Sequence, residues 1–134
     1  MKVIAVKNEA SVTVPAENFT GSARVTMVVK GEDPSNLSCG YVEFQPGARS
    51  NWHTHPKGQL LIVTDGEGRI QEWRKPVQVI KPGDVVWTPP GVKHWHGASP
   101  TSSMTHAAVT ETLDGKSVQW MEHVTDEQYK AQAK

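Results

Sequence analysis

Four side chains in the middle of the chain have the chemistry to bind one metal ion together: His53, His55, Gln59 and His94. Residues i and i+2 of a strand point to the same face, so His53 and His55 would project two imidazoles into one pocket. Gln59 would begin the next strand beside them, and His94 follows a Pro-Pro-Gly turn at 89–91. Imidazole nitrogens are favoured ligands of divalent transition metals. The spacing therefore predicts a metal site with three histidines and one glutamine.

The distribution of the histidines favours a functional site over a structural one. Taken alone, each histidine is better explained as a surface residue or a hydrogen-bonded core residue. Five of the six histidines, however, fall between positions 53 and 106, and they are paired twice at strand spacing, as 53/55 and 94/96. His123 lies outside this cluster, and we expect no role in the site for it.

Short β-type segments separated by strong turns must position these side chains. Segments 23–30 and 37–45 are rich in valine, tyrosine and phenylalanine, and the apolar run 60–63 is a further strand candidate. Tight connections are expected at 64–68, 81–84, 89–91 and 113–116. Thr125 and Gln128 form a capping-box pattern that predicts one short C-terminal helix, continuing toward Ala133. The pattern predicts an all-β sandwich or barrel.

Length and composition predict one domain, residues 1–134, and narrow the classes of partner. Hydrophobic residues make up 37% of the chain, charged residues 21%, and the formal net charge is zero, so neither nucleic acid nor an anionic membrane is an expected partner. The single cysteine, Cys39, excludes an internal disulfide and a cysteine-rich zinc site, and its expected role is packing. The N-terminus is not apolar enough for a signal peptide and no run approaches a membrane span, which predicts a cytoplasmic protein.

Two spaced motifs resemble those of the cupin family. The pattern Gly47-x5-His53-x-His55-x3-Gln59-x6-Gly66 resembles the first cupin motif, with glutamine in place of the usual glutamate. The pattern Gly83-x5-Pro89-x-Gly91-x2-His94 is similar to the second, with Ala98 where asparagine is often found. The resemblance covers 47–66 and 83–98. It implies a cupin double-stranded β-helix, a jelly-roll barrel, in which His53, His55, Gln59 and His94 bind the metal.

The chain also resembles a narrower group over most of its length: the small manganese-dependent bacterial cupins that include cupin hydroxynitrile lyases. The matching stretches are FTG (19–21), PGAR (46–49), WHTHP (52–56), GDVVW (83–87), KHWHGA (93–98), MTH (104–106), LDGK (113–116) and WMEHVTDEQY (120–129). This resemblance implies a lyase that cleaves a cyanohydrin to an aldehyde or ketone and hydrogen cyanide, or forms it. It also implies Mn(II), although Fe, Ni, Co and Zn accept the same ligand types.

The predicted ligands favour acid–base chemistry over oxygen activation. Three neutral imidazoles and a carboxamide leave the charge of a divalent ion uncompensated, so the ion would be a strong Lewis acid. His106 is the first candidate for the base that removes the hydroxyl proton, because the matching histidine in the resembling lyases is a second-sphere catalytic residue. His96 is a second candidate, and it could instead orient a ligand or a bound water.

Strand alternation also predicts which side chains surround the substrate. Trp52 and Trp95 alternate with the histidines and should point away from the pocket, while Glu43 and Glu111 should face outward. A largely apolar wall suited to an aromatic or alkyl substituent is expected from Gly40, Val42, Leu61, Trp87, Met104, Ala108 and Thr110.

Other functions are compatible with the same motifs. A metal-dependent oxygenase is the enzymatic alternative, and a non-catalytic small-molecule binding domain is the alternative from another class. A storage-like structural cupin is less favoured, because all four candidate ligands are present. The expected assembly is a homodimer or homotetramer formed through edge strands and N-terminal segments.

Overall fold

The computed structural model describes residues 1–134 as a β-barrel with one short α-helix at its end. Strands make up nearly all of its regular structure, which confirms the predicted fold class. The strands are β1 (Val12–Thr13), β2 (Phe19–Thr20), β3 (Ala23–Val29), β4 (Leu37–Phe44), β5 (Arg49–Ser50), β6 (His53–Thr54), β7 (Gln59–Gly66), β8 (Gly68–Glu72), β9 (Gln78–Ile80), β10 (Val85–Thr88), β11 (His94–Ala98), β12 (Met104–Glu111) and β13 (Gln119–Trp120). The helices are the 3₁₀-helix η1 (Val6–Asn8) and α1 (Asp126–Tyr129).

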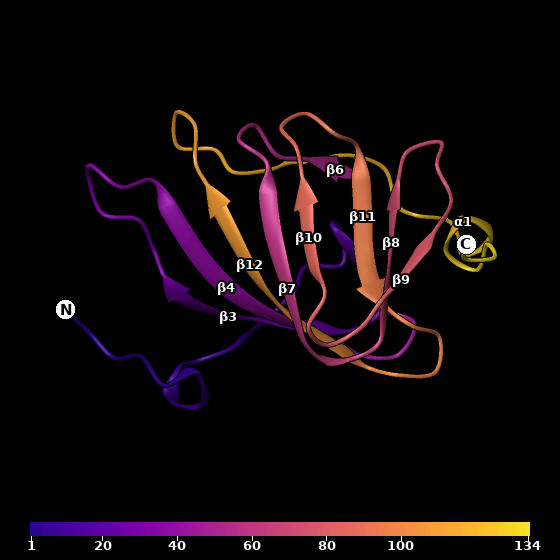
Figure 1. Ribbon diagram of the computed structural model, residues 1–134, viewed down its shortest axis with the longest axis horizontal. Helices are drawn as coiled ribbons and strands as arrows, with labels where there is room; N and C mark the ends of the chain where they lie inside the picture. The colour runs from indigo at the N-terminus through magenta and orange to yellow at the C-terminus, as the bar shows by residue number, and fades with distance from the viewer.

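Two antiparallel sheets form the barrel (Figure 1). The six-stranded sheet has the order β1-β3-β4-β12-β7-β10. The second sheet has the order β13-β6-β11-β5-β2, with β8 paired to β11 and β9 paired to β8. Neighbours in both sheets come from distant parts of the chain, as expected for a jelly roll. None of the helices is long and apolar enough to cross a membrane.

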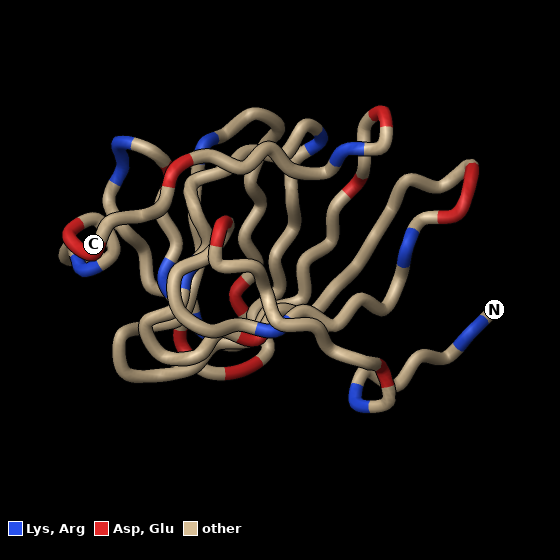
Figure 2. Tube along the Cα trace, turned by 180° about the vertical axis from the view of Figure 1, so that it is seen from behind, with Lys and Arg blue, Asp and Glu red and all other residues tan.

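Charged residues are interspersed along the whole chain rather than gathered by sign (Figure 2). The chain has 14 lysine and arginine residues and 14 aspartate and glutamate residues. Glu43 is exposed, and Glu111 is exposed and pairs with Lys57 across 3.4 Å, so both glutamates face outward as predicted. This distribution leaves the barrel interior free of carboxylates.

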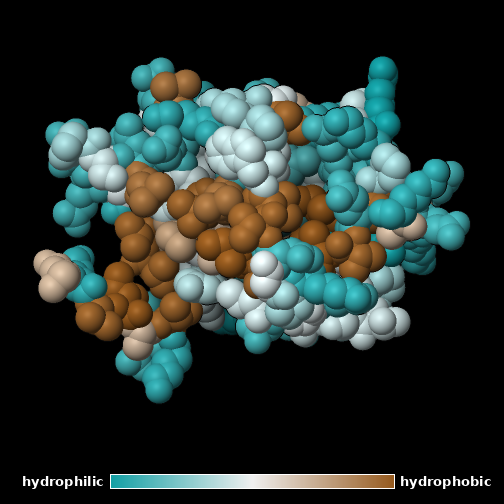
Figure 3. Space-filling model, in the orientation of Figure 1, coloured by the Kyte–Doolittle hydropathy of each residue, from teal (hydrophilic) through white to brown (hydrophobic).

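The outer face of the six-stranded sheet is unusually apolar for a sheet surface. Ile62 is opposite Val85, and Leu60 is opposite both Trp87 and Val109. Exposed fractions are 38% for Ile62, 60% for Val85 and 57% for Trp87. Figure 3 shows an apolar band across the molecule in the orientation of Figure 1. Both faces of this sheet therefore offer apolar packing surface.

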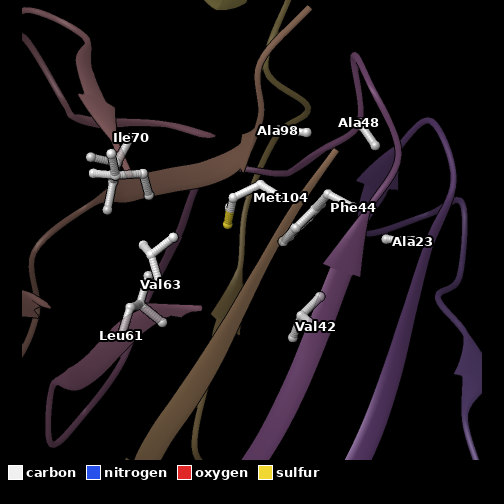
Figure 4. Close-up of a cluster of buried hydrophobic side chains, with 10 residues drawn as sticks. Ala23, Val42, Phe44, Ala48, Leu61, Val63, Ile70, Ala98 and Met104 are labelled. Carbon is white, nitrogen blue, oxygen red and sulfur yellow. The ribbon is translucent and has the colours of Figure 1, made fainter. Parts of the chain in front are cut away.

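Between the two sheets, one end of the barrel is filled by a closed apolar core (Figure 4). Phe44, Leu61 and Met104 are fully buried there, at 0% exposure. The remaining members of this core are Ala23, Val42, Ala48, Val63, Ile70, Ile80 and Ala98. Packing at this end leaves the other end, where β6 and β11 run side by side, for polar side chains.

A second apolar cluster lies on the outer face of the second sheet and is covered by the C-terminal segment. Trp52 and Trp95 point into it, away from the barrel interior, as strand alternation predicts. The capping box of Thr125 and Gln128 is present, but α1 ends at Tyr129, well short of Ala133. The helix ends because the chain turns to contact the sheet again. The Tyr129 hydroxyl donates to the Ala98 carbonyl, and the Lys134 amide donates to Val77.

Candidate metal centre

Strand pairing brings the predicted histidines together. β6 pairs with β11 so that His53 is directly opposite His94, and residues directly opposite each other share a face. The rings of His53 and His94 have centroids 4.3 Å apart, and His55 lies 4.9 Å from His53 and 5.3 Å from His94. All three are almost fully buried. The i, i+2 spacing therefore places His53 and His55 on one face, as the sequence predicts.

A turn at 56–58 connects these histidines to Gln59. Gly58 has φ +79°, and a Cβ atom there would lie 2.7 Å from the Thr88 carbonyl oxygen, so a side chain would clash. The amides of Gly58 and Gly91 both donate to the His55 carbonyl, which ties the two motif loops together. The Pro/Gly-rich loops thus fix the backbone immediately beside the candidate ligands.

Each of these histidines is held by a hydrogen bond from its Nδ1. The acceptors are the carbonyls of Asn51 for His53 (2.8 Å), Ser117 for His55 (2.7 Å) and Val92 for His94 (3.0 Å). A carbonyl oxygen can only accept, so Nδ1 carries the proton and Nε2 keeps its lone pair. Such outer hydrogen bonds are the usual way to orient a metal-binding imidazole.

Several buried acceptors of the cluster have no hydrogen-bond partner. They are Nε2 of His55, Nε2 of His94 and Oε1 of Gln59. The other end of the Gln59 carboxamide is satisfied, because Nε2 donates to the Thr110 hydroxyl across 3.1 Å. Buried acceptors without donors are costly unless a cation satisfies them. The donor set therefore fits a divalent metal ion.

His96 also belongs to the cluster, and it lies closer to His53 and His94 than the sequence indicates. One ring nitrogen from each of His53, His94 and His96 lies within 4.8 Å of the other two, a spacing at which three histidines can bind one ion, and the predicted ligand His55 is not one of these three. His96 follows His94 by two residues on β11, so it has the same inward direction. One of its nitrogens, Nδ1, is already engaged, since it lies 3.0 Å from Nε2 of His106.

His106 forms a buried pair with His96. Both rings pack against Phe44, at centroid distances of 5.8 Å for His96 and 5.7 Å for His106. His106 is fully buried and its Nδ1 has no partner. The two predicted catalytic histidines are therefore brought together as a hydrogen-bonded pair.

Burial keeps these histidines uncharged at neutral pH. Desolvation lowers the pKa of His94 and of His106 to about 4, and it lowers the pKa of His55 as well. His53 and His96 have a pKa well below the ordinary value, first from burial and then from the neighbouring imidazoles. Neutral imidazole is the form that binds a metal and accepts a proton.

A cavity of about 280 Å³ opens onto four of the histidines, namely His53, His55, His96 and His106. Four residues of the predicted wall line it: Gly40, Val42, Ala108 and Thr110. The sequence analysis missed Phe19, Val25, Met27, Ser38, Ser117, Val118 and Trp120, which also line it. Residues 117–120 follow a hairpin at 113–116 and carry no motif of their own, so only the folded chain shows that they reach the cavity.

Three predicted wall residues lie elsewhere. Leu61 and Met104 are in the closed apolar core. Trp87 is on the outer sheet surface, because it is paired with Leu60 rather than with Leu61. Opposite residues share a face, so this register directs the indole away from the barrel. These three residues therefore do not line the cavity.

Comparison with known proteins supports the resemblance to cupins that the two sequence motifs indicate. The cupin domain family matches residues 40–109. An (R)-mandelonitrile lyase from Granulicella tundricola is 54% identical over 130 residues, which cover 97% of this chain and 99% of that protein. A cupin-like protein from Thermotoga maritima superposes with a TM-score of 0.83 at 38% identity, covering 96% of this chain and 95% of that one. A polyketide cyclase from Streptomyces resistomycificus shares the fold, with a TM-score of 0.77 at 14% identity and coverage of 96% and 90%.

A jelly-roll barrel with a buried histidine cluster at one end defines a cupin. The chain belongs to the cupin domain family, and it is closely similar to the lyase from Granulicella tundricola along nearly its whole length.

Proposed function

We propose that this protein is a metal-dependent lyase that cleaves cyanohydrins to an aldehyde or ketone and hydrogen cyanide, and catalyses the reverse addition. The main support is the near full-length similarity to a protein named (R)-mandelonitrile lyase, at 54% identity. The histidine cluster, at the inner end of a mostly apolar cavity, gives this similarity a chemical basis.

In this proposal His53, His55, Gln59 and His94 hold the ion, which is Mn(II). The supporting observation is that Nε2 of His55, Nε2 of His94 and Oε1 of Gln59 lack partners within the chain. His53 adds a fourth donor, because its Nδ1 donates to the Asn51 carbonyl, which leaves the lone pair on Nε2. When bound, such an ion supplies Lewis-acid polarisation of a hydroxyl or carbonyl oxygen.

The pair of His96 and His106 is proposed to move the hydroxyl proton. His96 is adjacent to the ligand histidines, with ring centroids 5.3 Å from His53 and 5.9 Å from His94. In this proposal Nδ1 of His96 keeps its proton and donates a hydrogen bond to Nε2 of His106, so the lone pair on Nε2 of His96 can accept the substrate proton. His106 then stabilises the resulting imidazolium. This assigns proton acceptance to His96 and a positioning role to His106, the reverse of the order expected from sequence.

The cavity wall suits a compact apolar substituent. Val42, Met27 and Ala108 are apolar, and the Met27 sulfur packs against Gly40, 2.7 Å from where a Cβ atom would stand. A volume of about 280 Å³ is at the small end of ligand cavities, which fits a single aromatic ring with its cyanohydrin group. Nothing in the lining carries a fixed charge, so a neutral substrate is favoured.

The proposal is tested by mandelonitrile cleavage with the protein before and after manganese loading. Cleavage should follow the manganese content. It should fall by about a hundredfold or more in His96→Gln and by a smaller factor in His106→Gln. One equivalent of bound metal without cleavage would exclude this reaction and direct the search to oxygen-dependent substrates.

We also propose that the protein works as a homo-oligomer, with two copies packed through the outer face of the six-stranded sheet. The apolar face lies on three neighbouring strands, β12, β7 and β10, which are spaced about 4.8 Å apart. A patch of this width is smaller than the roughly 800 Å² that each partner buries in a standard interface, and the polar part of the sheet would supply the rest. A copy of the same chain offers the matching apolar surface.

Sedimentation velocity tests this assembly. The wild-type protein should sediment as a dimer or a larger species, and Ile62→Glu/Val85→Glu should sediment as a monomer. Thr64→Glu is the matched control, because it adds a charge farther along the same strand, where the surface is already polar. A monomeric wild-type protein would contradict the proposal.

A further inference from the structure

The carboxamide of Gln59 can be oriented in two ways, and only one of them suits a metal. A carboxamide has an oxygen that accepts and a nitrogen that donates, on nearly identical positions. With the oxygen toward the histidines it offers a lone pair to an ion. With the nitrogen toward them it offers protons and repels an ion. Something must therefore fix the orientation.

Thr110 is the hydrogen-bond partner of this carboxamide. It lies on β12 directly opposite Gln59 on β7, and the two side chains share the inner face. Nε2 of Gln59 donates to Oγ1 of Thr110 across 3.1 Å, and both residues are more than nine-tenths buried. This bond directs Oε1 toward the histidines, where it lacks a partner.

The opposite orientation would satisfy the protein without a metal. Gln59 and His55 line the same cavity, and Oε1 of Gln59 and Nε2 of His55 both lack partners. If the carboxamide were reversed, its nitrogen would donate to Nε2 of His55, which has no other partner. A threonine hydroxyl donates as well as accepts, so Thr110 can partner either orientation while no ion is bound, and the reversed orientation removes two metal ligands at once. Once Oε1 binds an ion, the NH₂ group depends on Thr110 as its acceptor.

We propose that Thr110 is a positioning residue that holds Gln59 in its metal-binding orientation and thereby lets a glutamine replace a glutamate in the ligand set. This role rests on the metal site proposed above. A glutamate would need no such partner, because its two oxygens are equivalent acceptors in either orientation. A glutamine needs an acceptor for its buried NH₂ group on the side away from the ion, and Thr110 supplies it.

Removing the hydroxyl at constant shape isolates this role. Thr110→Val keeps the volume but leaves the NH₂ group without an acceptor, so the reversed orientation toward His55 should prevail. Thr110→Ser keeps the hydroxyl. In the Gln59→Glu background the same Thr110→Val change should have little effect, because no orientation is lost.

The experiment measures Mn(II) affinity by competition with a chelator in these variants. We expect Thr110→Val to weaken binding by about tenfold, within the range typical of residues that orient metal ligands. Thr110→Ser should stay within about twofold of wild type, and so should Gln59→Glu/Thr110→Val relative to Gln59→Glu. Equal loss in both backgrounds would mean a general packing defect and would overturn the role.

A second readout follows the carboxamide itself. In the zinc-loaded protein, the Gln59 side-chain NH₂ protons should exchange slowly in wild type and Thr110→Ser, and faster in Thr110→Val, by nuclear magnetic resonance. Wild-type affinity in Thr110→Val, with slow exchange retained, would overturn the inference while leaving the metal site intact. A wild-type protein that binds no Mn(II) would instead overturn the metal site, and this role with it.

Discussion

The two faces of the segments around β6 and β11 both carry buried rings with polar atoms, but only the rings on one face have all their hydrogen bonds. On the outer face, the Trp52 indole donates to Oε1 of Gln128 and the Trp95 indole donates to Oε1 of Gln71. On the inner face, one residue away, the nitrogens of His55 and His94 that face the cluster have no partner. Both faces are equally buried.

Whether a buried nitrogen has a hydrogen-bond partner therefore distinguishes structural residues from candidate functional residues better than burial does. The chain provides an acceptor for each buried indole, although Gln128 is 76 residues away from Trp52. It provides no donor for the imidazoles a few ångströms away. Because buried polar atoms in native proteins are nearly always satisfied, the inner face is arranged for a ligand. Changes to the inner face should alter binding and catalysis, and changes to the outer face should alter stability.

The largest expected effect is from His55→Ala on the inner face. Removing one of the proposed ligands should release the metal and reduce mandelonitrile cleavage to the rate without enzyme, while the fold persists, because the ring lies in a cavity rather than in the core. Elemental analysis with a cleavage assay measures both quantities. Full metal content in the variant would remove His55 from the ligand set.

On the outer face, Trp95→Ala should destabilise the protein by about 3–5 kcal/mol, because a large buried side chain is lost from the second apolar cluster. Urea unfolding measures the loss. The metal content of the variant that remains folded should equal that of wild type. A selective loss of metal without loss of stability would show that the two faces are not independent.

Acid should destabilise the metal-free protein through the inner face. The pKa values of His94 and His106 are about 4 in the folded chain, below the ordinary 6.5, so the folded state binds fewer protons than the unfolded state. Their contribution is present above pH 6.5 and is lost as the pH falls toward 4. Between pH 7 and pH 5, His106 should cost on the order of 2 kcal/mol. Urea unfolding in a chelator should show a smaller drop for His106→Gln, and an unchanged drop would contradict the assignment.

The smallest effect is expected from Trp52→Phe. It keeps an aromatic ring in the cluster but removes the donor to Gln128, so the free energy of unfolding should fall by about 1 kcal/mol. Thermal unfolding of the metal-loaded and metal-free proteins measures it, and the difference between the two states should match that of wild type. A changed difference would connect this face to the metal.

The parts of the fold and site that could be predicted from sequence are those governed by local rules. Alternation places His53, His55, His94 and His96 inward and the two tryptophans outward, and the capping box at Thr125 places the helix start. Register is not a local property. A shift of one residue decides whether Trp87 faces the cavity or the solvent, and only its pairing with Leu60 settles that.

Contacts between distant segments were also beyond local reasoning. The bond between His96 and His106 depends on how the two sheets approach each other, and the cavity lining by Val118 and Trp120 depends on the path after the 113–116 hairpin. Similarly, nothing near Ala133 in the sequence indicates that the chain leaves its helix to contact Val77. Tertiary contacts override helix propensity there.

The carbonyl of Ser117 that holds His55 has a consequence for the order of events during synthesis. The chain is made from its N-terminus, so all four proposed ligands, up to His94, exist before Ser117 and the strand β13 that pairs with His53. A nascent chain can present the ligands, but it cannot yet hold them in their final orientation. In the proposed site, the ligands are therefore held in place only once residues 117–120 have been made, and removal of residues 117–134 would leave His55 and His53 without these contacts.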